Sequence, residues 1–393
     1  MDRFDVAVVG LGAMGAAALY HLARQGRRVI GLDRAAPGHE GGSSHGESRI
    51  IRLAQFENPA YTPLVERAWA LWDDLGRAGG EDLIWRTGML EGGLPGTPII
   101  EGSLRAAREN GLPHEALTAA QARARFPAFD LPDDWSIVFQ PQAGLVRADL
   151  AMRLHMAGAR TAGAVVREGA VVQAIEPGGS AVRLVLASGE AIAAEAVIVA
   201  AGGWIGELVP ELAPWLTVTR QAVCWFTPAR AADTGPDRMP VFVLEDETEA
   251  LYGFPDFMGT GVKAASHRLG QRLGSASDAR QDAGPSDAQP IAEALARLIP
   301  GAAGPLKTLK TCLYTSTPDD EFIIDRHPAD PRIILCSACS GHGFKFASAF
   351  GEALAQMTRA EGVPAPFRAF GLGRFGSLQA SLPPLGEVPA KRG

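Results

Sequence analysis

The stretch Phe4-Asp-Val-Ala-Val-Val-Gly-Leu-Gly-Ala-Met-Gly15 decides the fold of this chain. Its apolar half is rich in valine and predicts a strand that is buried on both faces. The segment 16–25 is rich in alanine and leucine and predicts a helix that ends at Gly26. A second predicted strand, over residues 28–33, ends on an acid, Asp33. The chain therefore opens with a strand, a glycine turn, a helix and a second strand.

This order of elements is typical of a dinucleotide-binding site. Gly10 makes the tight turn, Gly12 lets the backbone approach a pyrophosphate, and Gly15 lets helix and strand pack closely. N–H groups at the start of the helix face the phosphates, and Asp33 accepts from a ribose hydroxyl. A βαβ unit without a ligand is the alternative. The acid at the end of the second strand favours the nucleotide site over it.

Composition narrows the class of protein. The 393 residues, 47% of them hydrophobic, predict a large core and two domains. A net charge of -7 without a basic run argues against nucleic acid as a partner. No apolar run reaches membrane-spanning length, and the first strand begins too early for a signal peptide. We therefore expect a cytoplasmic protein that has no membrane partner.

The four cysteines, Cys224, Cys312, Cys336 and Cys339, do not resemble a disulfide framework in a chain of this length. The single Cys-x-x-Cys pair has no second pair, so we expect buried thiols and no metal. Only five of the 37 basic residues are lysines: Lys263, Lys307, Lys310, Lys345 and Lys391. Because arginine is the default cation here, a lysine inside a motif indicates a need for a compact ammonium.

A Gly/Ser-rich loop follows the second strand and leads into Ser48-Arg-Ile-Ile-Arg52. We expect a helix or turn there, with Arg49 and Arg52 on one face. The pair is either a solvated basic turn or two guanidiniums that face a cofactor ring or a substrate carboxylate. The residues alone leave both interpretations open.

The remaining elements are predicted from periodicity and turn signals. The predicted helices are 61–77, 104–110, 118–126, 148–162, 291–298 and 347–357. The predicted strands are 83–92, 136–139, 165–175, 182–187 and 333–336, with a second sheet over 216–265 and a surface excursion over 270–290. A strand over 195–200 runs into Gly202-Gly-Trp204, a pattern found where FAD rather than NAD is held.

Two lysines lie in informative places. Lys263 and His267 share one face of a strand-like segment, so Lys263 is either an edge-strand charge or an inward cation. A lone histidine such as His267 is more often structural. Lys345 lies where the predicted helix 347–357 begins, and a helix N-terminus disfavours a cation. This position suggests that Lys345 meets an anion.

Six segments carry a family resemblance, and they occur in the family's order. They are Gly41-Gly-Ser-Ser-His-Gly-Glu-Ser-Arg-Ile-Ile-Arg52, Tyr252-Gly-Phe-Pro, Lys263 with His267, Cys312-Leu-Tyr-Thr, Asp320-Glu-Phe-Ile-Ile-Asp325 and Ser340-Gly-His-Gly-Phe-Lys-Phe-Ala347. With the opening stretch, the chain resembles the monomeric sarcosine oxidase and N-methyltryptophan oxidase family of flavoproteins to about residue 370.

The resemblance implies an α/β fold with a glutathione-reductase-type FAD-binding Rossmann domain and a second, mixed-sheet substrate domain. The FAD domain would be discontinuous, with residues 1–82, 145–210 and 312–370. Residues 83–144 and 211–311 would form the substrate domain, and 371–393 a tail.

The resemblance also implies roles for individual residues. Cys312 matches the cysteine that forms a thioether to the flavin 8α-methyl group. Arg52 and Lys345 match the pair that holds the substrate carboxylate. Lys263 matches the lysine that activates oxygen. The other implied catalytic or substrate-contacting residues are Arg49, Tyr252, His267, Tyr314 and Gly341. The other implied cofactor contacts, besides the three glycines and Asp33, are Ala13, Met14, Arg34, Ser43, His45, Arg49, Val172, Ala201, Gly202, Trp204, Gly341, Gly343, Phe344 and Lys345.

Departures from the family pattern limit the substrate assignment. The chain has Ser44-His45-Gly-Glu-Ser where His-His often precedes Gly-Asp-Thr-Arg, and Leu53-Ala-Gln55 where His-Ala-Tyr is common. Cys339 replaces a larger apolar residue. The segments implied to hold the flavin and the carboxylate are kept, so the reaction type is better supported than sarcosine itself.

We expect an FAD-dependent oxidase of N-methyl or N-alkyl amino acids, in which the C–N bond becomes an imine and O2 becomes H2O2. A small-molecule amine and O2 would be the partners of a monomer. One alternative is the same chemistry on a cyclic or sugar-modified amino acid. Others are a dehydrogenase with a quinone or protein acceptor, and a non-catalytic flavin-binding module.

Overall fold

The first sheet is built around the opening strand of the chain. A computed structural model describes residues 2–246, 250–278, 283–359 and 362–376. In it, β1 (Arg3–Val9) lies between β2 (Val29–Leu32) and β12 (Ala191–Val199), and pairs in parallel with both. The sheet continues with parallel strands β9 (Val165–Arg167) and β20 (Asp330–Ser337), and with antiparallel strands β10 (Val172–Pro177), β11 (Val182–Leu186) and β19 (Ile323–His327).

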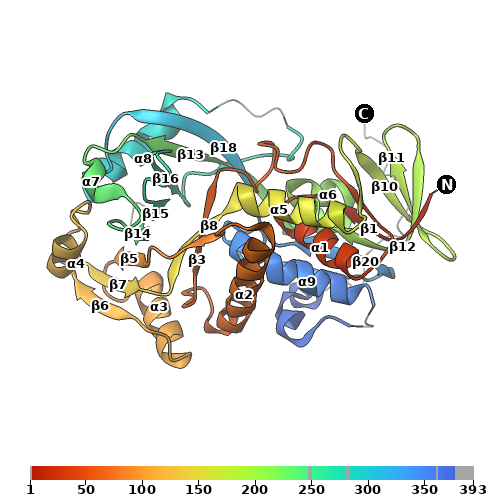
Figure 1. The fold of residues 1–393 in the computed structure, drawn as a ribbon, viewed down its shortest axis with the longest axis horizontal. Coiled ribbons are helices and arrows are strands. Elements are labelled where there is room, and N and C mark those ends of the chain that lie inside the picture. The colour runs from red at the N-terminus through yellow and green to blue at the C-terminus, as the bar shows by residue number, and fades with distance from the viewer. Residues whose placement is uncertain (1, 247–249, 279–282, 360–361, 377–393) are drawn as a thin grey trace.

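A layer of helices packs beside this sheet (Figure 1). It consists of α1 (Ala13–Arg24), α2 (Thr62–Gly79), α5 (Ala148–Thr161) and α9 (Ala347–Met357), and α1 contacts both α5 and α9. Small residues allow the close approach of α1 to α9, because a Cβ on Gly351 would lie 2.4 Å from the Cβ of Ala17. The short helix α6 (Ile205–Leu208) follows the Gly-Gly turn after β12.

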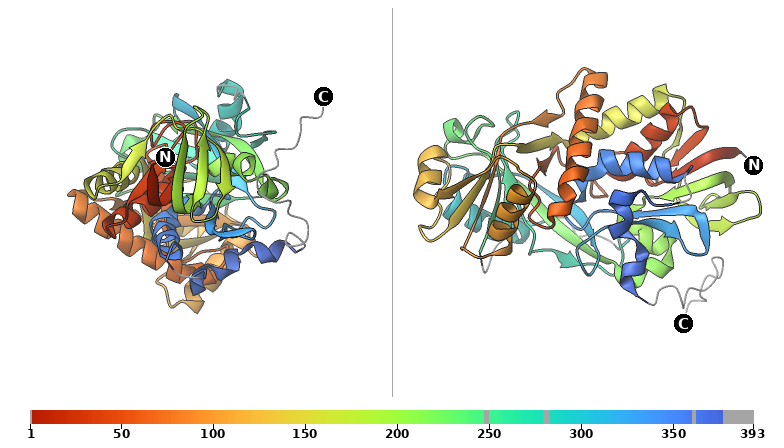
Figure 2. Two further views of the ribbon diagram at one scale, coloured as in Figure 1. Left: turned by 90° about the vertical axis from the view of Figure 1, so that its right-hand side faces the viewer. Right: turned by 90° about the horizontal axis from the view of Figure 1, so that it is seen from below.

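The second sheet occupies the other end of the molecule (Figures 1 and 2). Among the described residues its strands are β5 (Met89–Gly93), β6 (Glu115–Thr118), β7 (Ser136–Gln140), β13 (Thr217–Phe226), β14 (Val241–Glu245), β15 (Ala250–Phe254), β16 (Val262–Ser266), β17 (Gln271–Arg272) and β18 (Leu306–Ser316). The helices of this region are α3 (Pro98–Glu109), α4 (Ala119–Arg125), α7 (Ala231–Thr234) and α8 (Pro285–Leu298).

A small third sheet lies between the two large ones (Figure 1). It consists of β3 (Ser48–Arg52), β8 (Ala143–Arg147) and β4 (Ile84–Trp85). The expectation of a helix or turn at 48–52 is therefore wrong. Side chains alternate along a strand, so Arg49 and Arg52 leave β3 on opposite faces and not on one.

Other predicted elements differ in extent. The eleven-residue strand β18 was not predicted, although its sequence contains Cys312. Helix α8 begins at Pro285, inside the segment predicted as a surface excursion, and β17 also lies there. The expected strand 165–175 is two strands, β9 and β10, on opposite edges of the first sheet. The fold class is confirmed, whereas the domain boundaries stay a prediction.

Within the described residues, no helix combines the length and the apolar character that crossing a membrane requires.

Candidate functional site

One cavity of about 420 Å³ reaches all three sheets. The first sheet contributes the turn after β1, the end of β2 and the turn after β12. The small sheet contributes β3, and the second sheet contributes β15, β16 and β18. The loop 38–46 and the segment 336–345 complete the wall. Segments far apart in the sequence therefore meet around one space.

The glycine turn closes tightly against the end of β12. Gly10 has a φ of +90°, and a Cβ on it would lie 2.4 Å from the carbonyl oxygen of Ala200. Asp33 is buried and its Oδ2 accepts from the backbone N–H of Leu11 at 2.6 Å. The acid at the end of β2 therefore holds the turn in place as well as lining the cavity.

Gly15 is the predicted cofactor residue that does not line this cavity. A Cβ on Gly15 would lie 1.8 Å from the carbonyl oxygen of Gly10, so glycine is needed where α1 packs on the turn. Ser44, which was not predicted, lies at the start of α1, where its Oγ accepts from the N–H of Ala13 at 2.9 Å. Only its place beside the predicted contacts Ser43 and His45 could have suggested it.

Arg34 and Trp204 form another part of the wall, because the guanidinium of Arg34 lies 4.3 Å from the centre of the Trp204 ring. This contact joins the end of β2 to the turn after β12. The pair was predicted to contact the cofactor, and the structure brings it together.

The loop 43–49 is held by the guanidinium of Arg49. Its Nη2 donates to the carbonyl oxygens of Ser43, at 2.8 Å, and His45, at 2.6 Å. Burial, reinforced by the charge of Arg49, lowers the pKa of His45 to about 4. His45 is therefore a neutral imidazole inside the cavity wall at neutral pH.

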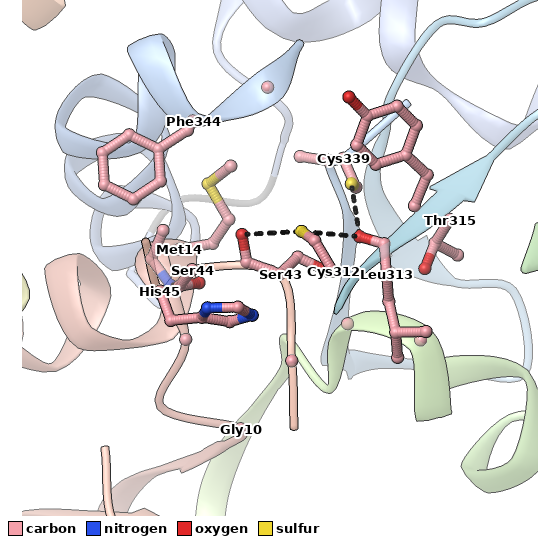
Figure 3. A pocket seen from close by; sticks show the side chains of 18 of the residues that line it. Gly10, Met14, Ser43, Ser44, His45, Cys312, Leu313, Thr315, Cys339 and Phe344 are labelled. Carbon is pink, nitrogen blue, oxygen red and sulfur yellow. Dashed lines mark hydrogen bonds between the residues drawn. The ribbon is translucent and has the colours of Figure 1, made fainter. Parts of the chain in front are cut away.

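Cys312 faces this loop from β18. Its Sγ lies 3.8 Å from the carbonyl oxygen of Ser43 and 3.7 Å from that of Leu313 (Figure 3). Cys339 shares the second of these acceptors, with its Sγ at 3.9 Å. Burial raises the pKa of Cys312, although the charges of Arg49 and Lys263 oppose the shift. The thiol is 5% exposed.

Lys263 is an inward cation and not an edge-strand charge. Its strand, β16, pairs on both sides, with β13 and with β15, and its side chain is only 4% exposed. Nζ donates to the carbonyl oxygens of Gly46, at 2.7 Å, and Ser48, at 2.8 Å. Burial, reinforced by the charge of Arg49, lowers the pKa of Lys263 well below its ordinary value.

Tyr252, Tyr314 and His267 form one connected group. The two hydroxyl oxygens lie 3.0 Å apart, Tyr314 Oη lies 3.3 Å from His267 Nδ1, and the rings of Tyr252 and His267 stack at 4.4 Å. Burial raises the pKa of Tyr252 to about 12 and lowers that of His267 to about 4. This wall is therefore uncharged and able to donate and accept hydrogen bonds.

Two cations and one carboxylate meet beside that group. Arg52 Nη2 donates to both oxygens of Glu57, at 2.7 and 2.6 Å. Lys345 Nζ lies 3.7 Å from Glu57 Oε1 and donates to the carbonyl oxygen of His342 at 2.9 Å. Burial lowers the pKa of Lys345 to about 7, although Glu57 opposes the shift. Burial would raise the pKa of Glu57, but the charges of Arg52 and Lys345 hold it well below its usual range.

The structure brings all other predicted site residues to the same cavity. Sequence reasoning missed Glu57 and His342, as well as Glu91 behind Arg52. A single glutamate after a strand gives no pattern that separates it from a surface residue. The roles of the predicted residues stay predictions.

Comparisons with known proteins agree with this arrangement. The family model described as FAD dependent oxidoreductase matches residues 5–357. Monomeric sarcosine oxidase of Streptomyces avermitilis is 36% identical over 90% of this chain and 93% of its own length. N-methyl-L-tryptophan oxidase of Yersinia pestis is 36% identical over 95% of this chain and 99% of its own.

Solved structures show the same fold at lower identity. NikD, an unusual amino acid oxidase essential for nikkomycin biosynthesis, superimposes in its open form with a TM-score of 0.83 at 22% identity, over 94% of this chain and 98% of its own. L-proline dehydrogenase from P. horikoshii gives 0.81 at 19% identity, over 95% and 98%. The chain therefore belongs to the FAD-dependent oxidoreductases and, within them, to the family of monomeric sarcosine oxidase and N-methyl-L-tryptophan oxidase.

Proposed function

We propose that this flavoenzyme is an oxidase of secondary amino acids, such as sarcosine or N-methyltryptophan. The observation that carries the proposal is the single cavity, in which the glycine turn after β1 shares a space with Arg52 and Lys345. One part of this space suits a dinucleotide, and the other suits a carboxylate. The names of the relatives at 36% identity support the choice of N-methyl amino acids.

The residues present fit FAD. The turn at Gly10 leaves no room for a side chain, so its backbone is free to approach a pyrophosphate. Asp33 stands at the end of β2, where a ribose hydroxyl would be held. The remaining contacts would come from Met14, Arg34, Ser43, Val172 and Trp204, which all line the cavity.

Bound FAD supplies a two-electron acceptor, and the chain's own residues position the amine against it. Arg52 and Lys345 would grip the substrate carboxylate by charge-assisted hydrogen bonds. The stacked Tyr252 and His267 would border the amine end, and neutral His267 could accept a proton there. These contacts would use binding energy to hold the C–N bond in a fixed orientation toward the flavin, and such positioning is a large part of catalysis. The C–N bond becomes an imine, which water hydrolyses.

We propose that O2 is the electron acceptor and H2O2 the product. Lys263 supports this part of the proposal, because an ammonium inside the cavity would stabilise negative charge that develops on oxygen.

We propose further that FAD is attached as a thioether through Cys312. The Sγ–H bond and one C8α–H bond would break and an Sγ–C8α bond would form, and the two protons and two electrons released would pass to O2, which becomes H2O2. A buried thiol on the cavity wall supports this attachment point.

The word monomeric in the name of one relative supports a monomer, and the four free thiols fit a reducing compartment such as the cytoplasm. The two-domain division at residues 82/83, 144/145, 210/211 and 311/312 belongs to the same proposal.

Two measurements on the purified protein test the function. Acid precipitation should leave the flavin absorbance with the polypeptide pellet. Peroxide production should follow addition of sarcosine or N-methyl-L-tryptophan in air. Proline and a sugar-modified amino acid are assayed in parallel. Faster turnover of either one would identify a cyclic or a sugar-modified amino acid as the substrate. Flavin bleaching without peroxide in air would indicate a dehydrogenase. No bleaching with any amine would overturn the oxidase.

A further inference from the structure

A second carboxylate stands behind the substrate-facing arginine. Glu91 lies in the middle of β5 and is 0% exposed. Its Oε1 lies 3.7 Å from Arg52 Nε. Both atoms are buried, and neither has a hydrogen-bond partner among the residues that the structure describes. The two groups therefore face each other across a gap that a shift of less than 1 Å would close into a hydrogen bond.

The other oxygen of Glu91 is held firmly. Oε2 accepts from Gln140 Nε2 at 2.7 Å. Gln140 also pairs with both backbone groups of Ala54, donating to its oxygen and accepting from its N–H, each at 3.2 Å. Since Gln140 lies on β7 and Ala54 just follows β3, this amide ties the strand of Arg52 to the second sheet. Glu91 is thus fixed relative to the strand of Arg52 through Gln140.

Another nitrogen of the same guanidinium, Nη2, is already hydrogen-bonded. Arg52 Nη2 donates to Glu57. Glu57 lines the cavity, and Glu91 does not line it. The Arg52 guanidinium also lies 4.4 Å over the ring of Phe56. A substrate carboxylate that enters the cavity would compete with Glu57 for Nη2. Glu91, which the cavity does not reach, can stay in place during that exchange.

Burying a carboxylate is unfavourable unless a partner compensates for the lost water. Replacing both members of a buried ion pair by apolar side chains of similar size is often neutral or stabilising, so such a pair is weak evidence of a stabilising role. Burial raises the pKa of Glu91, and the charge of Arg52 opposes this shift. A contribution to folding stability therefore does not explain why a glutamate occupies this buried position. Its approach to Arg52 Nε gives an explanation.

We propose that Glu91 is a positioning residue for carboxylate recognition: it holds the Nε–H group of Arg52 while Nη2 passes from Glu57 to the substrate carboxylate. The proposal rests on the proposed function, because it assumes that Arg52 grips the substrate. It predicts that Glu91 affects only ligands that carry a carboxylate. An acceptor oxygen at this place is needed, and its full charge is not.

The test compares Glu91→Met, which removes the acceptor at similar length, with Glu91→Gln, which keeps an amide oxygen. N-methyl-L-tryptophan and N-methyltryptamine serve as substrates, because they differ only in the carboxylate. For Glu91→Met we expect KM for N-methyl-L-tryptophan to rise about tenfold while kcat stays within about twofold, since about 1.4 kcal/mol corresponds to a factor of ten. The kinetics with N-methyltryptamine should not change. Glu91→Gln should recover KM to within about threefold of the wild type.

Acetate binding to the holoenzyme, followed by the flavin absorbance change, gives a readout that needs no turnover. Its Kd should rise in Glu91→Met and be restored in Glu91→Gln. If the wild type oxidised no amine while the acetate Kd still depended on Glu91, the proposed function would fail and this inference would stand. If the wild type oxidised N-methyl-L-tryptophan and Glu91→Met matched it in KM and Kd, the inference alone would fail.

The control is Asp330→Asn, which alters a buried carboxylate that pairs with Arg332 and does not line the cavity. It should leave both Kd and KM unchanged. Equal losses for N-methyl-L-tryptophan and N-methyltryptamine, or equal behaviour of the Met and Gln variants, would overturn the positioning role. If Glu91→Met does not fold, Glu91→Asp carries the test. It withdraws the carboxylate by one methylene and should raise KM at least about threefold for the carboxylate substrate alone.

Discussion

At the scale of the residue, burial decides what each charged side chain in the cavity can do. Lys263 and Lys345 are both nearly inaccessible, yet they differ in their partners. Lys263 donates to two carbonyl oxygens, that of Gly46 in the loop before β3 and that of Ser48 at the start of β3. Lys345 faces the carboxylate of Glu57. Two lysines in one cavity thus have different partners, which supports the proposal that Lys263 acts on oxygen and Lys345 on the substrate carboxylate.

Lys263→Met should slow reoxidation of the reduced flavin far more than its reduction by the amine. An electrostatic donor in a water-excluded site contributes about 10²–10³-fold to such a step, and we expect a loss of that size. Stopped-flow absorbance measures the two half-reactions separately. Lys307→Met is the matched control, since Lys307 is exposed and bonds to the carbonyl oxygen of Gly259. Equal losses in both half-reactions would contradict the assignment to oxygen.

The affinity for a carboxylate should depend on Lys345. Its pKa of about 7 means that the ammonium is present below pH 7 and is lost as the pH rises through that value. Because Arg52 is the second proposed contact to the carboxylate, we expect the Kd for acetate to rise above about pH 7 without loss of all binding. Acetate has no group that titrates in this range, so titration of the holoenzyme by flavin absorbance measures the effect directly.

Lys345→Met should weaken acetate binding at pH 6 and remove the rise in Kd above pH 7. A rise that persists in this variant would assign the titration to another group. The wild-type complex should also take up a proton above pH 7, because the bound carboxylate raises the pKa of Lys345.

At the scale of the element, local patterns predicted some parts and not others. The βαβ opening was predicted because a buried valine run, three glycines and an alanine-rich helix each signal their own structure. Helix α9 was predicted at its bounds for the same reason. Strand β3 was not, because Ser-Arg-Ile-Ile-Arg becomes a strand only by pairing with Ala143–Arg147, more than ninety residues later. Pairing partners that distant leave no trace in a local pattern.

The site shows the same division. Residues inside recognisable motifs, such as Lys263 and Cys312, were named from the sequence. Glu57 and Glu91 were not, since each is an isolated glutamate whose role comes from the arginine it meets. Arg52 itself was named, but its neighbours follow from how β3 packs between the two large sheets. The family resemblance therefore named the groups expected to contact cofactor and substrate, and it did not extend to the groups that hold them.

The glycine turn offers a test at this scale. Gly15→Ala should weaken FAD binding and lower the free energy of unfolding by about 2–4 kcal/mol, because the new Cβ would lie 1.8 Å from the carbonyl oxygen of Gly10. Thermal unfolding and flavin content measure both effects. Gly179→Ala is the control, since a Cβ there has open space. Wild-type stability in Gly15→Ala would show that α1 and the turn can separate without loss.

At the scale of the whole molecule, the cavity joins parts of the chain that otherwise lie apart. Ser43 lies in the loop between β2 and β3, Cys312 lies on β18 of the second sheet, and Phe344 lies just before α9. Figure 3 shows these three around one space. A ligand that contacts all of them stabilises their joint arrangement, because it binds the folded chain and not the unfolded one. We therefore expect the stability of the entire protein to depend on FAD.

The form of that dependence tests the covalent attachment. If Cys312 holds FAD, the wild type carries its ligand through unfolding, and its melting temperature should not change with added FAD. In Cys312→Ser the flavin should wash out on acid precipitation and bind reversibly before it. Its melting temperature should then rise with FAD concentration, with about 2.7 kcal/mol of stabilisation at a hundredfold excess over Kd.

Cys339→Ser is the matched control, because this thiol shares the Leu313 carbonyl with Cys312. It should keep its flavin through acid and show no dependence on added FAD. The reverse result, with flavin lost in Cys339→Ser and kept in Cys312→Ser, would assign the covalent attachment to Cys339.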